Sequence, residues 1–173
     1  RAGDDFEQVF YGYVNSVEEL VDIFTMLGLN ERHLKINNLE PQCIELELTE
    51  TAVMAESNIS IDILNELQQI GIEISIDDFG TGYSSLSHIK SLPISSLKID
   101  KSFVQDIMNN PNDAMIVKSV ISLTKNLHLG VIAEGIETKE QMQFLMDNGC
   151  KTGQGYYLSK PLSADDMTEF LKQ

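Results

Sequence analysis

The stretch IEISIDDFG, residues 72–80, says most about the fold of this chain. Its isoleucines alternate with polar residues, which is the two-residue period of a β-strand. The strand leads into two adjacent carboxylates, Asp77 and Asp78, which repel one another. A divalent cation such as Mg²⁺, which prefers carboxylate oxygen, would offset that repulsion. A metal site is therefore one interpretation of the pair, and an ordinary solvated turn is the other.

Three further strand-like segments also end in charged residues. They are CIELELTE (43–50) with Glu47 and Glu50, SSLKIDKSF (95–103) with Lys98 and Asp100, and LGVIAEGIET (129–138) with Glu134 and Glu137. Lys98 and Asp100 are two residues apart, so we expect both side chains on one face of their strand. Charged groups at the carboxyl ends of successive parallel strands are typical of (β/α)-barrel enzymes, which place their active sites there.

Helical patterns separate these strands, because apolar residues recur at intervals of three and four between them. We expect helices at 59–70, 113–127 and 138–146, and strands at 43–48, 72–76, 95–99 and 130–134. This alternation predicts an α/β fold whose parallel strands follow the order of the sequence. An open doubly wound sheet is the alternative, but we find no GxGxxG motif after a first strand. Acidic strand ends fit a barrel with metals better.

Composition limits the classes of function. The 173 residues carry a formal net charge of −15, which disfavours binding to duplex nucleic acid. No apolar run approaches the ~20 residues of a membrane-spanning helix, and no signal peptide is visible. We therefore expect a cytoplasmic domain without a membrane segment, although the parent protein could still carry an anchor. Cys43 and Cys150 lie in apolar runs without a CxxC motif, which predicts reduced core residues.

Five motifs, in order along the chain, resemble the EAL domain, the cyclic di-GMP phosphodiesterase family of bacterial signalling. They are ELTE (47–50), DDFGTGYSSL (77–86), LKIDKSFV (97–104), IAEGIET (132–138) and GQGYYLSKPL (153–162). The resemblance implies a modified (β/α)₈ barrel that hydrolyses a phosphodiester bond of cyclic di-GMP to give linear pGpG. It also implies a two-metal site that uses Mg²⁺ or Mn²⁺.

The resemblance also implies roles for individual residues. Its motifs give Glu47, Asp77 and Asp78 as metal ligands, Lys98 and Glu134 as catalytic groups, Asp100 as support for Lys98, Glu137 and Gln154 beside the substrate, and Glu50, Gly80, Thr81 and Gly82 in a regulatory loop. Lys98 would hold the attacking water or a phosphate, and Glu134 would act as general base or metal partner. The loop couples dimerisation to activity in this family, so we expect a homodimer through the 79–90 region. From the residues alone, Asp100 and Glu137 could equally be structural ion-pair partners, and Gln154 a loop residue.

The resemblance weakens towards the N-terminus. The upstream EAL motif, which supplies a metal-binding glutamate in this family, has no counterpart before Glu47, so we divide the chain into an unassigned segment, 1–42, and the C-terminal portion of an EAL domain, 43–173. The first segment is either the third strand and helix of the family, with Asn15 as a metal ligand, or, from AGDDF (2–6), the remnant of a GGDEF domain. Both interpretations give an N-terminally truncated, incomplete barrel. The function is then either phosphodiesterase, with at best residual activity in this chain, or an inactive remnant that binds nucleotide or protein.

Overall fold

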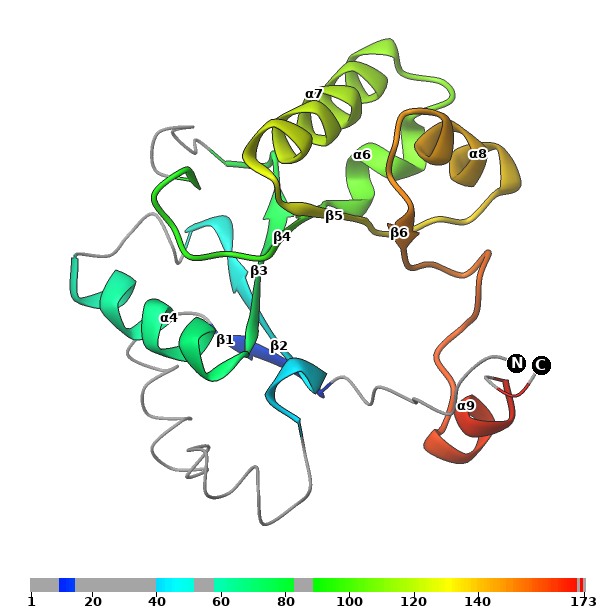
Figure 1. Cartoon of the computed structure of the whole chain (residues 1–173). Coiled ribbons are helices and arrows are strands. Elements are labelled where there is room, and N and C mark those ends of the chain that lie inside the picture. Colours follow the sequence, from blue (N-terminus) through cyan, green and yellow to red (C-terminus); the bar gives the residue numbers. More distant parts are fainter. Residues whose placement is uncertain (1–9, 15–39, 52–57, 83–88, 171, 173) are drawn as a thin grey trace.

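Strands and helices alternate along the chain (Figure 1). The computed structural model describes residues 10–14, 40–51, 58–82, 89–170 and 172. In chain order the elements are β1 (Phe10–Val14), the 3₁₀ helix η1 (Pro41–Cys43), β2 (Ile44–Thr49), α4 (Asn58–Ile70), β3 (Glu73–Phe79), β4 (Ser96–Ile99), α6 (Lys101–Asp106), α7 (Pro111–Leu127), β5 (Gly130–Ala133), α8 (Lys139–Asp147), β6 (Thr152–Gly153) and α9 (Ala164–Phe170). All the strands and helices that the sequence predicted are present, and the α/β class is confirmed.

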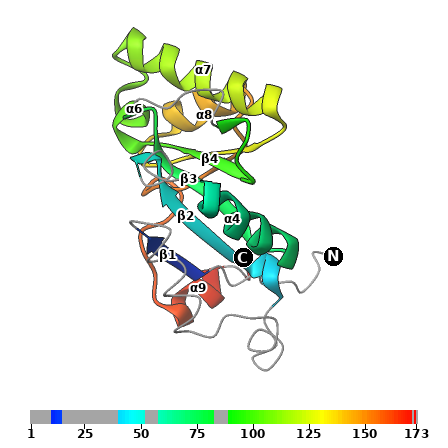
Figure 2. The same ribbon diagram turned by 90° about the vertical axis from the view of Figure 1, so that its left-hand side faces the viewer.

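The strands of the described chain form one parallel sheet in the order β1-β2-β3-β4-β5-β6. This order follows the sequence, as we predicted for β2 to β5, because right-handed crossovers place consecutive strands side by side. Within the described residues β1 and β6 are the outer strands of the sheet. Figure 2 shows β1 at one end of the strands and α6, α7 and α8 gathered around the other.

The two faces of the sheet differ in polarity. The strand register pairs Leu46 with Ile74 and Leu48 with Ile76, so these buried side chains form rows across one face. Because successive side chains on a strand point to opposite faces, the residues between them turn to the other side. That second face carries the polar residues, for example Glu47 beside Ser75. The sequence therefore builds an apolar core on one side of the sheet and a polar surface on the other.

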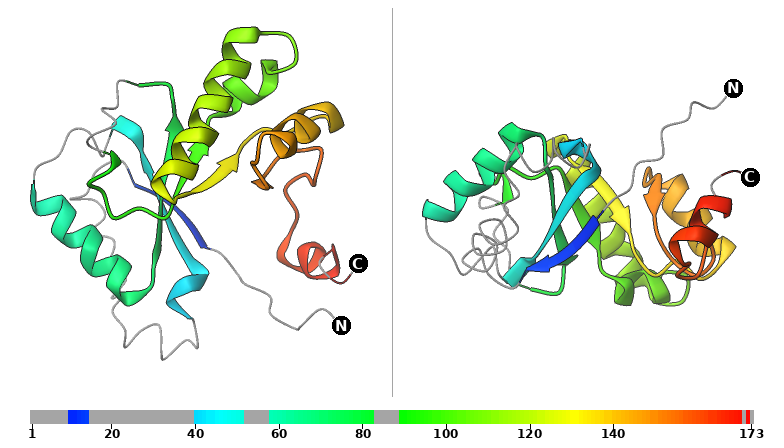
Figure 3. Two further views of the ribbon diagram at one scale, coloured as in Figure 1. Left: turned by 45° about the horizontal axis from the view of Figure 1, so that its top comes forward. Right: turned by 90° about the horizontal axis from the view of Figure 1, so that it is seen from below.

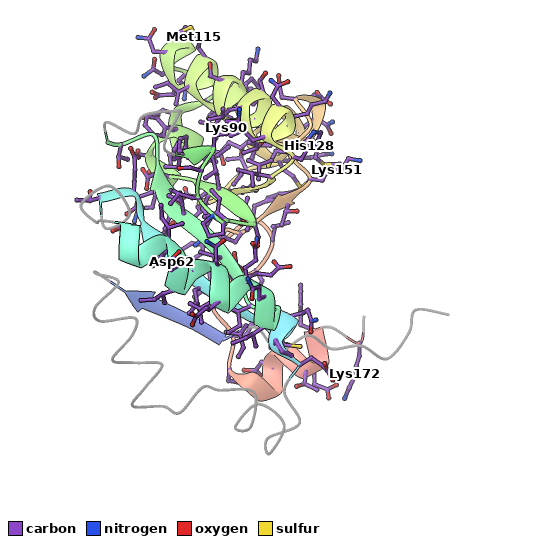
Figure 4. The ribbon with its side chains drawn as sticks, turned by 60° about the vertical axis from the view of Figure 1, so that its left-hand side comes forward. Asp62, Lys90, Met115, His128, Lys151 and Lys172 are labelled. Carbon is purple, nitrogen blue, oxygen red and sulfur yellow. The ribbon has the colours of Figure 1, made fainter. Side chains whose placement is uncertain are left out.

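Helices cover the apolar side. α4 contacts β3, whereas α7 contacts β4 and β5. The buried apolar residues described on these helices are Leu64, Leu67, Val117, Val120 and Ile121. In both views of Figure 3, α4 and α9 lie on opposite sides of the strands. Figure 4 shows Asp62 on α4 and Met115 on α7, and both residues are exposed. No helix in the described ranges has the length and apolar character needed to cross a bilayer.

Several features were not predicted. β1, α6, β6 and α9 are short elements that gave no clear periodic signal, and β3 continues through both aspartates to Phe79. Cys150 is buried as expected, but Cys43 is only half-buried, because it ends η1 at the edge of the core. Asn15 and the AGDDF segment lie outside the described residues.

Candidate active site

Four charged side chains from neighbouring strands meet near the carboxyl end of the sheet. Glu47 belongs to β2, Asp77 to β3 and Lys98 to β4, and Glu134 directly follows β5. The Nζ atom of Lys98 lies 2.6 Å from Oε1 of Glu47 and 2.6 Å from Oε1 of Glu134. It also lies 3.5 Å from Oδ1 of Asp77. The structure thus brings together the four residues that we expected to cluster, and we call this set the ion cluster.

The ion cluster is buried and carries an excess of negative charge. The exposed fraction of the side chain is 3% for Lys98, 3% for Glu47, 0% for Asp77 and 14% for Glu134. Burial alone would lower the pKa of Lys98, but its hydrogen bonds with Glu134 and Glu47 outweigh burial and raise that pKa above the ordinary value. Lys98 therefore stays protonated among three carboxylates.

The adjacent aspartates are directed to different partners. Asp78 has a φ of 54°, which is rare outside glycine, and the pairing of β3 with β4 shifts register between Ile76 and Phe79. The amide of Asp78 donates a 2.9 Å hydrogen bond to Oδ1 of Asp77. This irregularity lets Asp77 face Lys98 while Asp78 meets Asp100. Uncommon backbone conformations of this kind often occur at functional sites.

Asp78 and Asp100 form a pair of interacting carboxyl groups. Burial, the charge of Asp77 and a hydrogen bond with Asp100 raise the pKa of Asp78 to about 6. Burial would also raise the pKa of Asp100, but hydrogen bonds from the hydroxyl and amide of Ser102 outweigh it and lower that pKa. Asp100 is the N-cap of α6, where its Oδ1 accepts a 2.9 Å hydrogen bond from the Ser102 amide. The structure shows contacts of Asp100 with Ser102 and Asp78, and its expected support of Lys98 stays a prediction.

Gln154, directly after β6, contacts Glu134. Its Nε2 donates a 2.7 Å hydrogen bond to Oε1 of Glu134, the oxygen that also contacts Lys98. Burial raises the pKa of Glu134, and the hydrogen bond with Lys98 only partly opposes this. Gln154 therefore does more than fill a loop, because it orients this carboxylate. Glu137 lies on the surface, where its Oε1 accepts a 3.3 Å hydrogen bond from Nε2 of Gln105.

Glu50 binds the loop that follows β3. Its buried carboxylate accepts hydrogen bonds from the amides of Gly80, at 3.1 Å, and Gly82, at 3.3 Å. A β-carbon on Gly82 would lie 2.8 Å from Oε1 of Glu50, so the close approach needs glycine there. Gly80 has a φ of 102°, which glycine also favours. Thr81, between them, donates its hydroxyl to the carbonyl of Asp78 at 2.9 Å.

The chemistry of these donors suits a hard divalent cation. Glu47 on β2, Asp77 and Asp78 on β3, and Glu134 directly after β5 present carboxylate oxygens, the ligand type that Mg²⁺ and Mn²⁺ prefer. The raised pKa of Asp78 reflects burial first and then the negative charge of Asp77, and a cation would offset the second of these. Among the residues that the structure describes, no three such groups surround a common point, since the Lys98 ammonium contacts Glu47 and Glu134. The residue types fit a metal, and their present arrangement is that of an ion cluster.

The sequence did not reveal two parts of this site. Ser102 contacts Asp100, and the pattern Asp-Lys-Ser after a strand is a helix N-cap signal that could have predicted both the contact and α6. The different partners of Asp77 and Asp78 had no signal, because a register shift depends on the neighbouring strand. Residues 83–88 of the expected dimer region lie outside the described chain.

Comparisons with known proteins identify the family of this chain and several of its relatives. Residues 18–161 match the EAL domain family, so the match begins ahead of our expected boundary at residue 43. The cyclic di-GMP phosphodiesterase NbdA of Pseudomonas aeruginosa is 45% identical over 129 residues, which make up 75% of this chain and 16% of NbdA. The chain spans about a fifth of the length of the curated relatives it matches.

Solved structures show the same fold. The phosphodiesterase PaMucR, in complex with cyclic di-GMP, superposes with a TM-score of 0.82 at 37% identity and covers 91% of this chain, which in turn covers 63% of PaMucR. BlrP1 of Klebsiella pneumoniae, in complex with manganese and cyclic di-GMP, has a TM-score of 0.77 at 30% identity, with 87% of this chain and 38% of BlrP1 covered. The described strands therefore belong to a (β/α)-barrel of the EAL type, as the sequence predicted.

Proposed function

The chain belongs to the EAL domain family, and from this premise we propose that it carries reactive groups of a cyclic di-GMP phosphodiesterase. This hydrolase adds water to one phosphodiester bond of cyclic di-GMP and releases linear pGpG. The observation that carries the proposal is the convergence of Glu47, Asp77 and Glu134 on Lys98 in a buried cluster at the carboxyl end of the sheet. A (β/α)-barrel places its chemistry at this end.

We propose that Glu47, Asp77 and Asp78 hold Mg²⁺ or Mn²⁺ in a two-metal site. The negative excess of the ion cluster and the manganese in the BlrP1 complex support this assignment. Such metals lower the pKa of bound water and offset the negative charge of the phosphodiester. The carboxylates would therefore turn from groups that repel an anionic substrate into groups that hold its counter-charge.

Lys98 and Glu134 carry the proton and charge chemistry in this proposal. Lys98 remains an ammonium because the surrounding carboxylates raise its pKa, so it can bind a phosphate oxygen or orient the attacking water. The raised pKa of Glu134 makes it a stronger acceptor for a proton from that water than an exposed glutamate. Gln154 holds Glu134 by its 2.7 Å hydrogen bond. Asp100, the N-cap of α6, would support Lys98, and Glu137 in the loop after β5 would lie beside the substrate.

The setting of the activity is also part of the proposal. We propose a cytoplasmic location, which suits the free thiols of Cys43 and Cys150, and no binding of duplex nucleic acid, which the charge of −15 disfavours. We further propose a homodimer through the 79–90 region, because Glu50 fixes the exposed Gly80 to Gly82 segment next to Asp78. Sedimentation of the chain over a range of concentrations tests the dimer, and a monomer at every concentration would contradict it.

Chromatography of pGpG after incubation with cyclic di-GMP and Mn²⁺ tests the function. We expect turnover by the parent protein, weaker turnover by this chain, and none by either after Asp77→Asn, which keeps the shape but removes the charge. Asp62→Asn is the matched control, because Asp62 is exposed on α4. A folded parent protein that releases no pGpG would overturn the proposal. Binding of cyclic di-GMP without turnover would favour a nucleotide-binding role instead.

A further inference from the structure

The side-chain amide of Gln141 joins two segments that flank the ion cluster. Gln141 lies in the first turn of α8 and is 5% exposed. Its Oε1 accepts hydrogen bonds from the amides of Glu137, at 2.8 Å, and Thr138, at 2.9 Å. Its Nε2 donates a 3.0 Å hydrogen bond to the carbonyl of Gln105, near the end of α6. A single buried side chain thus connects the loop after β5 with the helix after β4.

Part of this arrangement is an ordinary helix cap. The Thr138 hydroxyl accepts a 3.2 Å hydrogen bond from the Gln141 amide, and together they form a capping box at the start of α8. A glutamate at position 141 would serve that cap equally well, because a carboxylate oxygen can accept the same hydrogen bonds as Oε1 of the glutamine. The bond to Gln105 needs a donor, and only the amide supplies one. This second bond is therefore separable from the cap.

Each of the two joined segments adjoins a member of the ion cluster in the sequence. α6 begins directly after Asp100, two residues beyond Lys98, and the loop 134–138 begins with Glu134. The amide of Glu134 donates to the carbonyl of Ile99 at 3.2 Å. The loop also packs closely on α6, since a β-carbon on Gly135 would lie 2.7 Å from the β-carbon of Lys101. At the other end of the loop, Gln141 adds a hydrogen bond to Gln105, near the end of α6.

We infer that Gln141 is a positioning residue, which fixes the Glu134 carboxylate relative to Lys98 through its bond to α6. The inference rests on the phosphodiesterase function proposed above. Gln141 acts only through the loop and α6. Its loss therefore changes the alignment of Glu134 and the rate of the chemical step, while substrate binding stays close to normal. Displacement of a reacting group by about 1 Å can cost about 10²-fold in rate.

The test separates the bond to α6 from the cap. Gln141→Glu keeps the cap and loses the donor to Gln105, so we expect kcat to fall by about 10²-fold with KM little changed. If the buried carboxylate of Gln141→Glu prevents folding, Gln141→Met takes its place in the test. Methionine has a similar shape but forms no such hydrogen bonds, so we expect the same loss of kcat. Thr138→Ala is the control that weakens the cap alone. It should lower the melting temperature by about 2–4 °C and leave kcat near that of the unchanged chain.

Hydrogen exchange of the Glu134 amide gives a readout that does not require turnover. We expect this amide to exchange faster after Gln141→Glu or Gln141→Met, and at an unchanged rate after Thr138→Ala. Equal kcat values in all three variants, or an unchanged exchange rate at Glu134 in both Gln141 variants, would overturn the positioning role. If the unchanged chain and its parent protein release no pGpG, the proposed function fails, and the exchange of Glu134 alone decides whether Gln141 holds this loop.

Discussion

Replacing Lys98 by Met removes the ammonium that three carboxylates share in the ion cluster. At an effective dielectric constant of about 20, each 2.6 Å contact of Lys98 contributes roughly 6 kcal/mol of attraction. Desolvation of the buried charges offsets most of that attraction. Removal of one partner leaves the other charges buried and unpaired, which costs about 3–5 kcal/mol. We therefore expect Lys98→Met to lower the free energy of unfolding by this amount.

Urea denaturation followed by circular dichroism measures this loss. With a slope of about 2 kcal/mol per molar urea, the unfolding midpoint should fall by roughly 2 M. Lys172→Met is the matched control. Lys172 lies 2.7 Å from Glu169, nearly the distance found for Lys98, but the two side chains are 64% and 72% exposed. Water screens such a pair, so its loss should cost less than about 1 kcal/mol.

A second substitution identifies the cause of the loss. Glu134→Gln removes one carboxylate charge from the cluster, so it should restore part of the stability in the Lys98→Met background and cost stability in the unchanged chain. The non-additivity of the two substitutions measures their coupling. Equal, small midpoint shifts for Lys98→Met and Lys172→Met, or strict additivity with Glu134→Gln, would refute the reasoning that buried charge pairing holds this cluster.

Three further predictions concern the proposed metal site, the loop after β3 and the buried thiol of Cys150. Mn²⁺ at a hundred times its dissociation constant should stabilise the chain by about 2.7 kcal/mol in a melting experiment. Asp77→Asn should abolish that gain, and an equal gain in both chains would contradict the metal assignment. Glu50→Ala leaves the amides of Gly80 and Gly82 without their acceptor, so it should cost about 1–3 kcal/mol and speed hydrogen exchange at both amides, whereas unchanged exchange would refute this. Burial raises the pKa of the Cys150 thiol above its ordinary value of 9.0, so the folded state retains that proton longer and stability should decline as pH rises through and beyond that value. Cys150→Ala should remove this contribution to the decline, and an unchanged pH dependence would contradict it.

The strand sequences alone predicted the sheet and the charged groups at its carboxyl end. Isoleucine alternation in 72–76 and the charged residues at the ends of the four predicted strands placed charged groups at one edge of the sheet, because parallel strands bring their carboxyl ends to one side. The cluster therefore depends on the order of the strands, which the right-handed crossover rule supplies. The strand ends also carry other charged residues, among them Glu50 and Glu137, so the resemblance to the EAL motifs was needed to select the four members of the cluster.

Other parts of the site depend on contacts between distant segments. The positive φ of Asp78 and the register shift of β3 arise where two strands pair, so the sequence of one strand does not reveal them. The same holds for Gln141, which on sequence is one polar residue in the first turn of a helix. Its bond to Gln105 joins residues that are 36 positions apart. Local patterns predict elements, and such tertiary bonds are added only when the elements pack.

Burial of the charged groups of the ion cluster carries a large desolvation penalty, and this penalty is informative about the role of the cluster. Apolar side chains of similar volume in place of a buried ion cluster are often neutral or stabilising. The chain nevertheless combines a buried lysine on β4 with adjacent aspartates on β3, one of which has a positive φ although it is not glycine. Departures from local rules that bring no stability are expected where a site performs chemistry. The carboxyl end of this sheet is therefore better explained as a functional site than by the needs of the fold, and the apolar face of the same strands supplies the stability.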